Sequence, residues 1–229
     1  LHIGTDGGGS VRIPAAFCGI VGIKANFGRV PVYPASPFGT LSHLGPMTRD
    51  VEDAALMLTV MAEPDPRDAF SLPFDGRDYS AALGAGVCGL RVAYSPDLGY
   101  ANVDPQVAFL VEKAAKSFEE LGATVEVIKP IFDNPQEIFR THWYAGAAHV
   151  MRSIPEAKQK LVDPGLRYVA EKGSQIDMDT YLNSALERAA LVVKMRKFHQ
   201  KYDILLTPTM PVSAFMLGND SLIGGNGES

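Results

Sequence analysis

An apolar run, an amphipathic stretch and a second apolar run follow one another between residues 90 and 128. The two apolar runs, LRVAYS and ATVEVI, have the length and composition of β-strands. Between them, Asp104 can cap a helix, Pro105 fits its first position and Gly122 can end it. The pattern predicts a β-α-β unit with two parallel strands joined right-handedly, and therefore an α/β fold in which helices flank a sheet.

Three further stretches have helical periodicity. In TRDVEDAALMLTVMA, Thr48 is placed to cap the helix, and acidic residues follow where they oppose the helix dipole. One face of this helix is apolar and is expected to pack on a sheet: Val51, Ala54, Ala55, Leu58, Met61 and Ala62. The other two predicted helices are residues 135–152 and 179–199, and the second ends in basic residues that suit a helix C-terminus.

Strands and loops complete the predicted organisation. LHIGTD resembles the end of a buried strand, and YDILLTPTMP is expected to be a buried strand that enters a proline-stopped loop. Prolines make residues 29–46 a loop, and residues 63–89 are expected to form a long surface connection. The final stretch GNDSLIGGNGES has no pattern that would close a domain.

Composition narrows the classes of function. The 229 residues are enough for one large domain or two small ones, and the formal net charge of -5 offers no basic surface for nucleic acid. No apolar run approaches the roughly 20 residues that a membrane span needs. Cys18 and Cys88 lie far apart, which indicates neither a disulfide framework nor a zinc site and predicts reduced thiols in the cytoplasm. We expect Cys18 to be a small buried hydrophobe.

The stretch GTDGGGSVRIPA carries the clearest chemical signal. The Walker pattern requires Lys and then Ser or Thr after its glycines, whereas Val11 and Arg12 follow Ser10 here. The G-x-G-x-x-G pattern counted from Gly7 has Arg12 in place of its last glycine, and the G-x-S-x-G elbow lacks its final glycine. A glycine run nevertheless turns backbone N–H groups inward, which favours a nucleophilic serine beside an oxyanion hole.

Residues outside the glycine run carry weaker signals. Asp6 and Arg12 flank the loop with opposite charges and are expected to hold it through hydrogen bonds. His142 and His149 could share a helix face, but a pair without a third ligand is weak evidence for a metal. Four aromatic residues fit either an acyl-group pocket or a core stripe: Phe132, Phe139, Trp143 and Tyr144.

The stretch GTDGGGSVRIPAAFCGIVGIKANFGRVP, followed by LSHLGPMTRDVEDAALML and later by YDILLTPTMP, closely resembles the amidase signature family. The likeness is strong over residues 3–62 and 202–211 and generic between them. It implies a mixed β-sheet between helices, and it implies that residues 1–229 are the central to C-terminal part of one amidase domain, truncated at both ends. Gly7 departs from many members, which carry a small polar or apolar residue there.

The resemblance also implies a mechanism. Ser10 attacks an amide carbonyl to form an acyl-serine, and backbone N–H groups of Gly7, Gly8, Gly9 and Ser10 form the oxyanion hole. In the family, a bridging serine and a neutral base lysine lie upstream of the nucleophile, and the expected truncation removes both. Lys24 matches a later lysine of the family, so we expect its stem to pack on neighbours with its amine near carbonyls or solvent. This chemistry needs neither a metal nor an organic cofactor.

Three functions remain open at this point. The first is an amidase that hydrolyses a small-molecule carboxamide, with the isolated 229-residue segment inactive. The second is the glutaminase (A) subunit of a tRNA-dependent amidotransferase, which would pass ammonia to partner subunits. The third is a non-catalytic domain that binds an anion or carboxylate in the glycine loop. Truncation would also expose strand edges and apolar faces that favour self-association.

Overall fold

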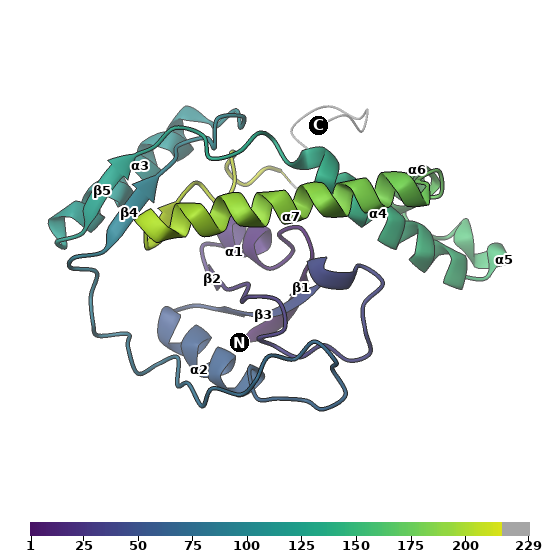
Figure 1. Cartoon of the computed structure of the whole chain (residues 1–229), viewed down its shortest axis with the longest axis horizontal. Helices are drawn as coiled ribbons and strands as arrows, with labels where there is room; N and C mark the ends of the chain where they lie inside the picture. Colours follow the sequence, from purple (N-terminus) through teal and green to yellow (C-terminus); the bar gives the residue numbers. More distant parts are fainter. Residues whose placement is uncertain (217–229) are drawn as a thin grey trace.

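The computed structural model describes residues 1–216, whose strands form two separate three-stranded sheets (Figure 1). The first sheet is antiparallel in the order β1-β3-β2, and the second is parallel in the order β5-β4-β6. The strands are β1 (His2–Asp6), β2 (Val21–Gly22), β3 (His43–Thr48), β4 (Arg91–Tyr94), β5 (Thr124–Val127) and β6 (Ile204–Leu206). The α/β class is confirmed, although the described strands divide into two sheets where a single mixed sheet was expected.

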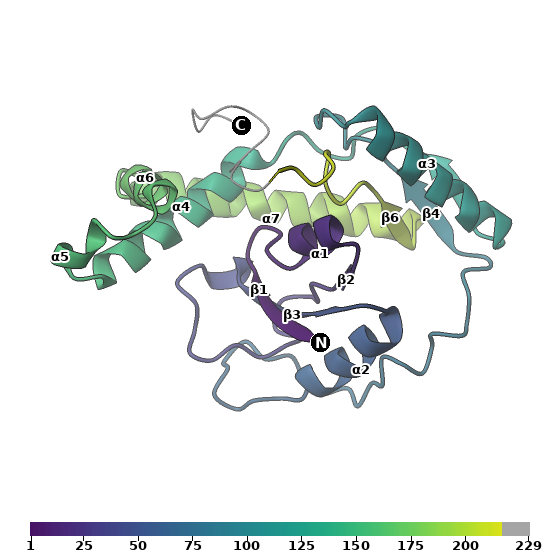
Figure 2. The same cartoon turned by 180° about the vertical axis from the view of Figure 1, so that it is seen from behind.

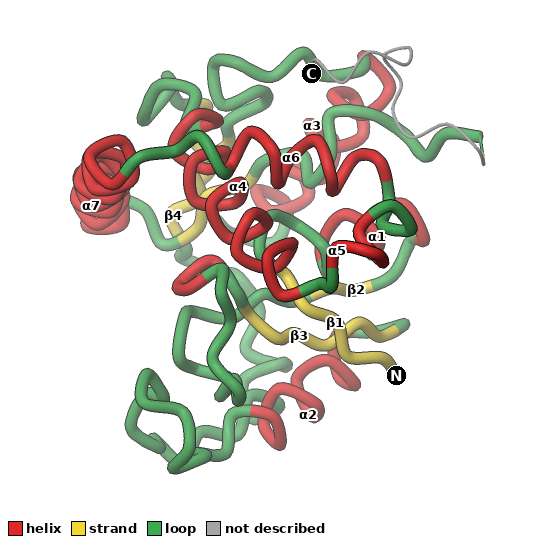
Figure 3. Tube along the Cα trace, turned by 90° about the vertical axis from the view of Figure 1, so that its right-hand side faces the viewer, coloured by secondary structure: helices red, strands yellow, loops and turns green. Residues whose placement is uncertain are grey.

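Helices cover both sheets. The short helix α1 packs on β2, α2 packs on β3, α3 packs on β5, and α4 contacts α6 and α7. Figure 2 shows the sheets and helices from behind, and Figure 3 shows α2 on the far side of the antiparallel sheet from α1. The helices are α1 (Arg12–Cys18), α2 (Val51–Met61), α3 (Pro105–Glu120), α4 (Gln136–Ser153), α5 (Glu156–Gln159), α6 (Pro164–Gly173) and α7 (Met178–Lys201), with a 3-10 turn, η1 (Gly39–Leu41).

The antiparallel sheet confirms two predicted elements and corrects two details. The predicted strand LHIGTD is β1, but its side chains are mostly exposed and only Asp6 is buried. The predicted helix α2 begins one turn later than expected, because Asp50 caps it by accepting the backbone N–H of Asp53 at 2.8 Å. Thr48 is the last residue of β3 and donates its hydroxyl to the carbonyl of Asp50. The prediction that Thr48 caps α2 was therefore wrong.

The parallel sheet contains the predicted β-α-β unit. Strands β4 and β5 pair in parallel, and Asp104 caps α3 by accepting the N–H of Gln106 at 2.8 Å. Strand β6 pairs with the other edge of β4, so that YDILLTPTMP contributes the strand that the sequence predicted. Arg91 and Asp203 form an ion pair across this junction at 2.7 Å.

The two long helices predicted from periodicity are α4 and α7, whereas α5 and α6 were not predicted. Pro155 and Pro164 stand at the starts of the two short helices, where proline interrupts a periodic pattern but is sterically tolerated. No helix or strand occurs in residues 63–89, which pass around the outside of the molecule from α2 to β4 (Figure 1). None of the helices within residues 1–216 is long and apolar enough to cross a membrane. The stretch GNDSLIGGNGES lies outside the described residues.

Candidate active site

The glycine loop, residues 7–11, connects β1 to α1 and presents Ser10 at an exposed turn. Its sharpest point is Gly9, whose φ of 118° is a conformation that other residues rarely adopt. The carbonyl of Gly9 accepts the N–H of Ile13 at 2.7 Å, which joins the loop to the first turn of α1. Val11 is fully buried and anchors the end of the loop. The serine is therefore exposed on a loop that both adjoining elements hold.

Asp6, at the end of β1, is buried beneath the loop and accepts four hydrogen bonds. Its carboxylate receives the backbone N–H groups of Gly9 at 2.7 Å and Val11 at 3.3 Å. Arg12 adds a bidentate contact, with Nε and Nη2 each 2.9 Å from a different carboxylate oxygen. Two parallel charge-assisted hydrogen bonds fix orientation as well as distance. One carboxylate therefore ties both ends of the loop together.

The pKa of Asp6 reflects a balance between burial and these partners. Burial alone would raise the pKa, because the charged form loses its hydration. The hydrogen bonds and charge of Arg12, together with the N–H groups of Gly9 and Val11, outweigh burial and lower the pKa to about 2. The carboxylate is therefore ionised at neutral pH.

The backbone N–H groups of the loop differ in availability. The N–H of Gly9 is already donated to Asp6. The N–H groups of Gly7, Gly8 and Ser10 donate to no group within residues 1–216. Free N–H groups beside an exposed serine are an arrangement that can hold a developing oxyanion after the serine attacks a carbonyl carbon.

Aromatic side chains from α4 pack directly against the glycine loop. A Cβ built on Gly7 would lie 2.8 Å from Cζ3 of Trp143, and one built on Gly8 would lie 2.5 Å from Cζ of Phe139. Phe38 stacks on the other side of Trp143 with ring centroids 4.5 Å apart. The loop thus requires glycine at these two positions because aromatic rings occupy the space. The sequence left Phe139 and Trp143 open between pocket and core, and only the approach of α4 to the loop reveals this contact.

Two titratable groups lie near the loop. Lys24 donates its Nζ to the carbonyl of Ala25 at 2.9 Å, and burial, followed by the charge of Arg12, lowers its pKa. His43 pairs with Asp6 in the register of β1 and β3, and burial lowers the pKa of its imidazole. The sequence did not single out His43, because its position beside Asp6 depends on strand pairing.

Other residues named from the sequence lie in separate environments. Cys18 is exposed, so the prediction that it is a buried hydrophobe was wrong; it lies at the solvent-facing end of α1. His142 is buried in α4, whereas His149 is exposed. No group of three or more His, Cys, Asp or Glu side chains suited to a metal occurs in the described part of the chain.

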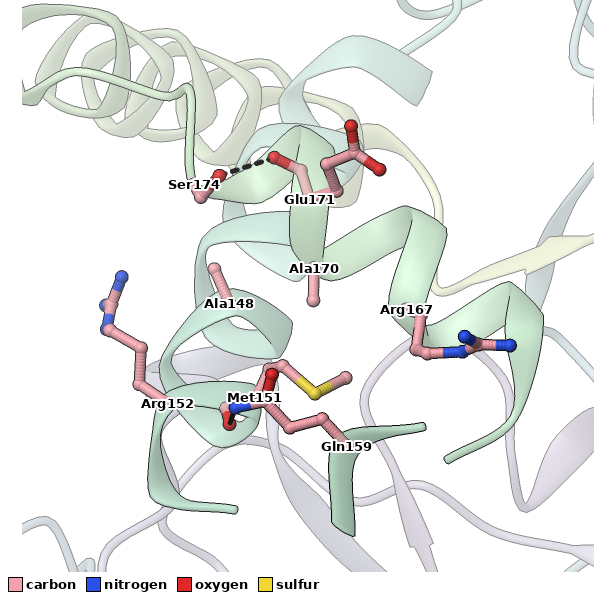
Figure 4. Close-up of a pocket in the computed structure, with 8 residues that line it drawn as sticks. All are labelled: Ala148, Met151, Arg152, Gln159, Arg167, Ala170, Glu171 and Ser174. Atoms are coloured by element: carbon pink, nitrogen blue, oxygen red, sulfur yellow. Dashed lines mark hydrogen bonds between the residues drawn. The ribbon is translucent and has the colours of Figure 1, made fainter. Parts of the chain in front are cut away.

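A pocket of about 360 Å³ lies among α4, α5 and α6, but its polar groups do not converge. Figure 4 shows the guanidinium groups of Arg152 and Arg167 on opposite sides of the pocket. Ser174 donates its hydroxyl to the carbonyl of Glu171 at 2.6 Å rather than into the pocket. The glycine loop therefore remains the candidate active site.

A buried carboxylate that fixes a strand-to-helix turn, free backbone N–H groups and an exposed serine together suit nucleophilic attack on a carbonyl compound. A sequence model of the family described as Amidase matches residues 1–227. The chain belongs to this family.

Curated relatives have two kinds of name. The chain is 36% identical over 220 residues to an acylamidase of Rhodococcus erythropolis, covering 95% of this chain and 46% of that protein. It is 35% identical over 223 residues to an amidase of Pseudomonas putida, covering 96% of this chain and 48% of that protein. It is also 33% identical over 251 residues to the (A) subunit of the glutamyl-tRNA(Gln) amidotransferase of Moorella thermoacetica, covering 94% and 50%.

A solved structure of a bacterial aryl acylamidase from the amidase signature family is similar in fold. It superimposes with a TM-score of 0.86 at 28% identity, covering 99% of this chain and 49% of that chain. The chain therefore spans about half the length of the curated and solved relatives that it matches.

Proposed function

We propose that the protein containing this chain hydrolyses a carboxamide through an acyl-Ser10 intermediate. The observation that carries the proposal is the exposed Ser10 beside free backbone N–H groups, on a loop fixed by Asp6. In the first step, Oγ of Ser10 bonds to the carbonyl carbon, and the proton of the hydroxyl passes to the departing amine or ammonia. Water then cleaves the ester and releases the carboxylic acid.

The proposed oxyanion hole uses the N–H groups of Gly7, Gly8 and Ser10. These groups are unoccupied in the described chain, whereas the N–H of Gly9 is donated to Asp6. Gly9 therefore has a different proposed role, which is to provide the backbone turn that aims its neighbours at the carbonyl oxygen. Asp6 and Arg12 are positioning residues, because they act on the substrate only through the loop.

The general base is proposed to come from the part of the amidase domain that precedes the nucleophile in this family. Lys24 is a poor candidate for the base, because its Nζ is already directed at the carbonyl of Ala25. Replacing Lys24 by Met should therefore affect folding more than proton transfer. General-base assistance is worth about 10²–10⁴-fold, so the 229-residue chain alone should show no measurable amide hydrolysis.

A fluorophosphonate probe tests the nucleophile directly. In the full-length protein we expect one adduct on Ser10, located by mass spectrometry of the digested protein. Ser10→Ala should abolish both the adduct and the hydrolysis of an anilide, while Ser117→Ala, an exposed serine on α3, should change neither. An adduct on Cys18, or an active Ser10→Ala protein, would refute the assignment. A folded full-length protein that neither reacts nor hydrolyses amides would favour a non-catalytic anion-binding domain.

A second candidate function rests on the amidotransferase relatives. The Moorella thermoacetica protein matches nearly the whole chain, at an identity only slightly below that of the acylamidase. Under this alternative, the same Ser10 chemistry releases ammonia from glutamine, and partner subunits consume it. Copurifying partner subunits and ATP-dependent transamidation of a glutamyl-tRNA would establish it. Hydrolysis of anilides by the purified protein without partners would instead favour the amidase.

A further inference from the structure

A second pocket, of about 400 Å³, lies between α7, α4 and the loop that precedes β3. Aromatic and small apolar side chains form much of its wall, including Phe38, Tyr181 and Ala189. Its polar lining consists of His142, Arg188 and Thr40, with no acidic side chain. This volume and this mixture of apolar wall and few polar groups are typical of small-molecule sites.

His142 is the unusual member of this lining. The residue is only 8% exposed, and its Nε2 is buried without a hydrogen-bond partner in residues 1–216. The imidazole makes an edge-to-face contact with Tyr181 at 4.9 Å between ring centroids. A buried polar atom without a partner destabilises a fold, so such an atom on a pocket wall indicates a missing ligand group.

Arg188 gives the pocket its charge. Its Nη1 donates to Oγ1 of Thr40 at 2.5 Å and its Nη2 donates to the carbonyl of Thr40 at 3.2 Å. A guanidinium has five N–H donors, so donors remain for a ligand. Burial, followed by the charge of Arg188, lowers the pKa of His142. The imidazole is therefore neutral at neutral pH and can donate from Nε2 as one tautomer.

We propose that this pocket, the His142–Arg188 pocket, binds a small carboxylate that carries an aromatic or aliphatic group. The carboxylate would accept hydrogen bonds from Nε2 of His142 and from the free N–H groups of Arg188. Its apolar body would lie against Phe38, Tyr181 and Ala189. This geometry satisfies the buried nitrogen and places a negative charge beside an arginine that no acidic side chain in the pocket neutralises. The proposal does not depend on Ser10 as a nucleophile.

The pocket also lies close to the glycine loop. Phe38 lines the pocket on one side and stacks on Trp143, the ring that packs on Gly7. The charge of Arg188 also contributes to the lowered pKa of Lys24. A bound carboxylate would therefore contact the aromatic rings that support the loop, and its binding is expected to change the reactivity of Ser10.

Nitrogen NMR of the full-length protein labelled with ¹⁵N-histidine tests the proposal. The chain contains five histidines, and loss of one signal set in His142→Gln assigns the relevant pair. Sodium benzoate is the probe, and benzyl alcohol is its uncharged match. We expect saturable benzoate-dependent shifts of the His142 nitrogens, with benzoate bound at least about tenfold more tightly than benzyl alcohol because of the charge-assisted contacts.

Variants locate the binding and separate it from the proposed active site. Ala189→Phe should fill the pocket and abolish the shifts, whereas Ala190→Phe, an exposed neighbour outside the pocket lining, should leave them unchanged. Arg188→Gln should weaken benzoate at least about tenfold and leave benzyl alcohol unaffected. Ser10→Ala should bind benzoate like the parent protein, so that failure of the serine chemistry leaves this test intact.

Three results would overturn the proposal. One is the absence of any benzoate effect on His142 in the full-length protein, which would mean that protein atoms fill the pocket there. Another is equal affinity for benzoate and benzyl alcohol, which would exclude recognition of the charge. The last is a benzoate response that survives Ala189→Phe, which would place the ligand elsewhere.

Discussion

The glycine loop and the His142–Arg188 pocket treat buried polar groups in opposite ways. Beneath the loop, Asp6 is fully buried and all of its partners come from the chain itself. In the pocket, His142 is almost as deeply buried, but its Nε2 has no partner within the described residues. The first arrangement fixes a backbone conformation, and the second leaves bonding capacity unused. Saturated polar groups therefore mark positioning devices, and unsaturated ones mark candidate ligand contacts.

The largest effect should come from Asp6→Asn. The amide offers one acceptor oxygen where the carboxylate offers two, and its NH₂ group faces donors from Arg12 or Val11. We expect the free energy of unfolding to fall by about 3 kcal/mol, as for other buried ion pairs that lose one partner. Urea unfolding of both proteins measures the difference. A change below about 1 kcal/mol would show that the four contacts do not act as a unit.

Gly9→Ala should have the next largest effect, because it attacks the same loop through its backbone. The φ of 118° disfavours any side chain, and the new Cβ would lie 2.6 Å from Cδ1 of Ile13. We expect a loss of about 2 kcal/mol in unfolding free energy and slower labelling of Ser10 by a fluorophosphonate.

Gly19→Ala is the matched control for that change. Gly19 also has a positive φ, of 64°, but a Cβ there would meet nothing within 4 Å. It should lower the unfolding free energy by about 1 kcal/mol and leave the labelling of Ser10 unchanged. Equal effects of the two variants on labelling would show that the position of Gly9 in the loop is unimportant.

Acid should weaken the loop more gradually than either substitution. The pKa of Asp6 is lowered from 3.8 to about 2 in the folded chain, so below pH 3.8 the unfolded state binds more protons than the folded state. The contribution of Asp6 to stability should be complete above pH 3.8 and should disappear as the pH falls through about 2. Unfolding measured between about pH 5 and about pH 2 should show the difference between parent and Asp6→Asn shrinking on acidification. A constant difference would contradict the lowered pKa.

His142→Leu should have the smallest effect and should sharpen the contrast with Asp6. Because Nε2 has no partner to lose among the described residues, we expect the unfolding free energy to change by less than about 1 kcal/mol. The same variant should lose its preference for benzoate over benzyl alcohol in calorimetric titrations. A loss as large as that of Asp6→Asn would mean that His142 has a structural partner.

The sequence predicted those features that depend on local patterns. Periodicity located α2, α4 and α7, and capping residues located the β-α-β unit around α3. It also paired the charges of Asp6 and Arg12 across the loop, because six positions separate them and one turn brings them together. Its failures at Thr48 and Cys18 concern details of a helix start and of exposure. Both depend on where neighbouring elements lie.

Features that join distant segments could not be predicted. Division of the strands into two sheets depends on pairing across more than a hundred positions, and no local pattern encodes such pairing. The contacts of Phe139 and Trp143 with the loop require α4 to cross it, and the orphan nitrogen of His142 requires α7 to cover it. The sequence thus identified the candidate serine and the type of loop. The supporting walls became visible only in three dimensions.

The position of β4 at the centre of the parallel sheet has a consequence for the order in which the molecule forms. Its partner β5 follows after one helix, but β6 pairs with its other edge, and the ion pair there joins residues 112 positions apart. During synthesis, the β4-α3-β5 unit is complete long before residues 204–206 leave the ribosome. For that interval one edge of β4 has unpaired backbone groups, which can pair with another nascent chain. Closure by β6 is therefore a late, slow step, and the yield of folded protein should depend on how well that edge is protected until then.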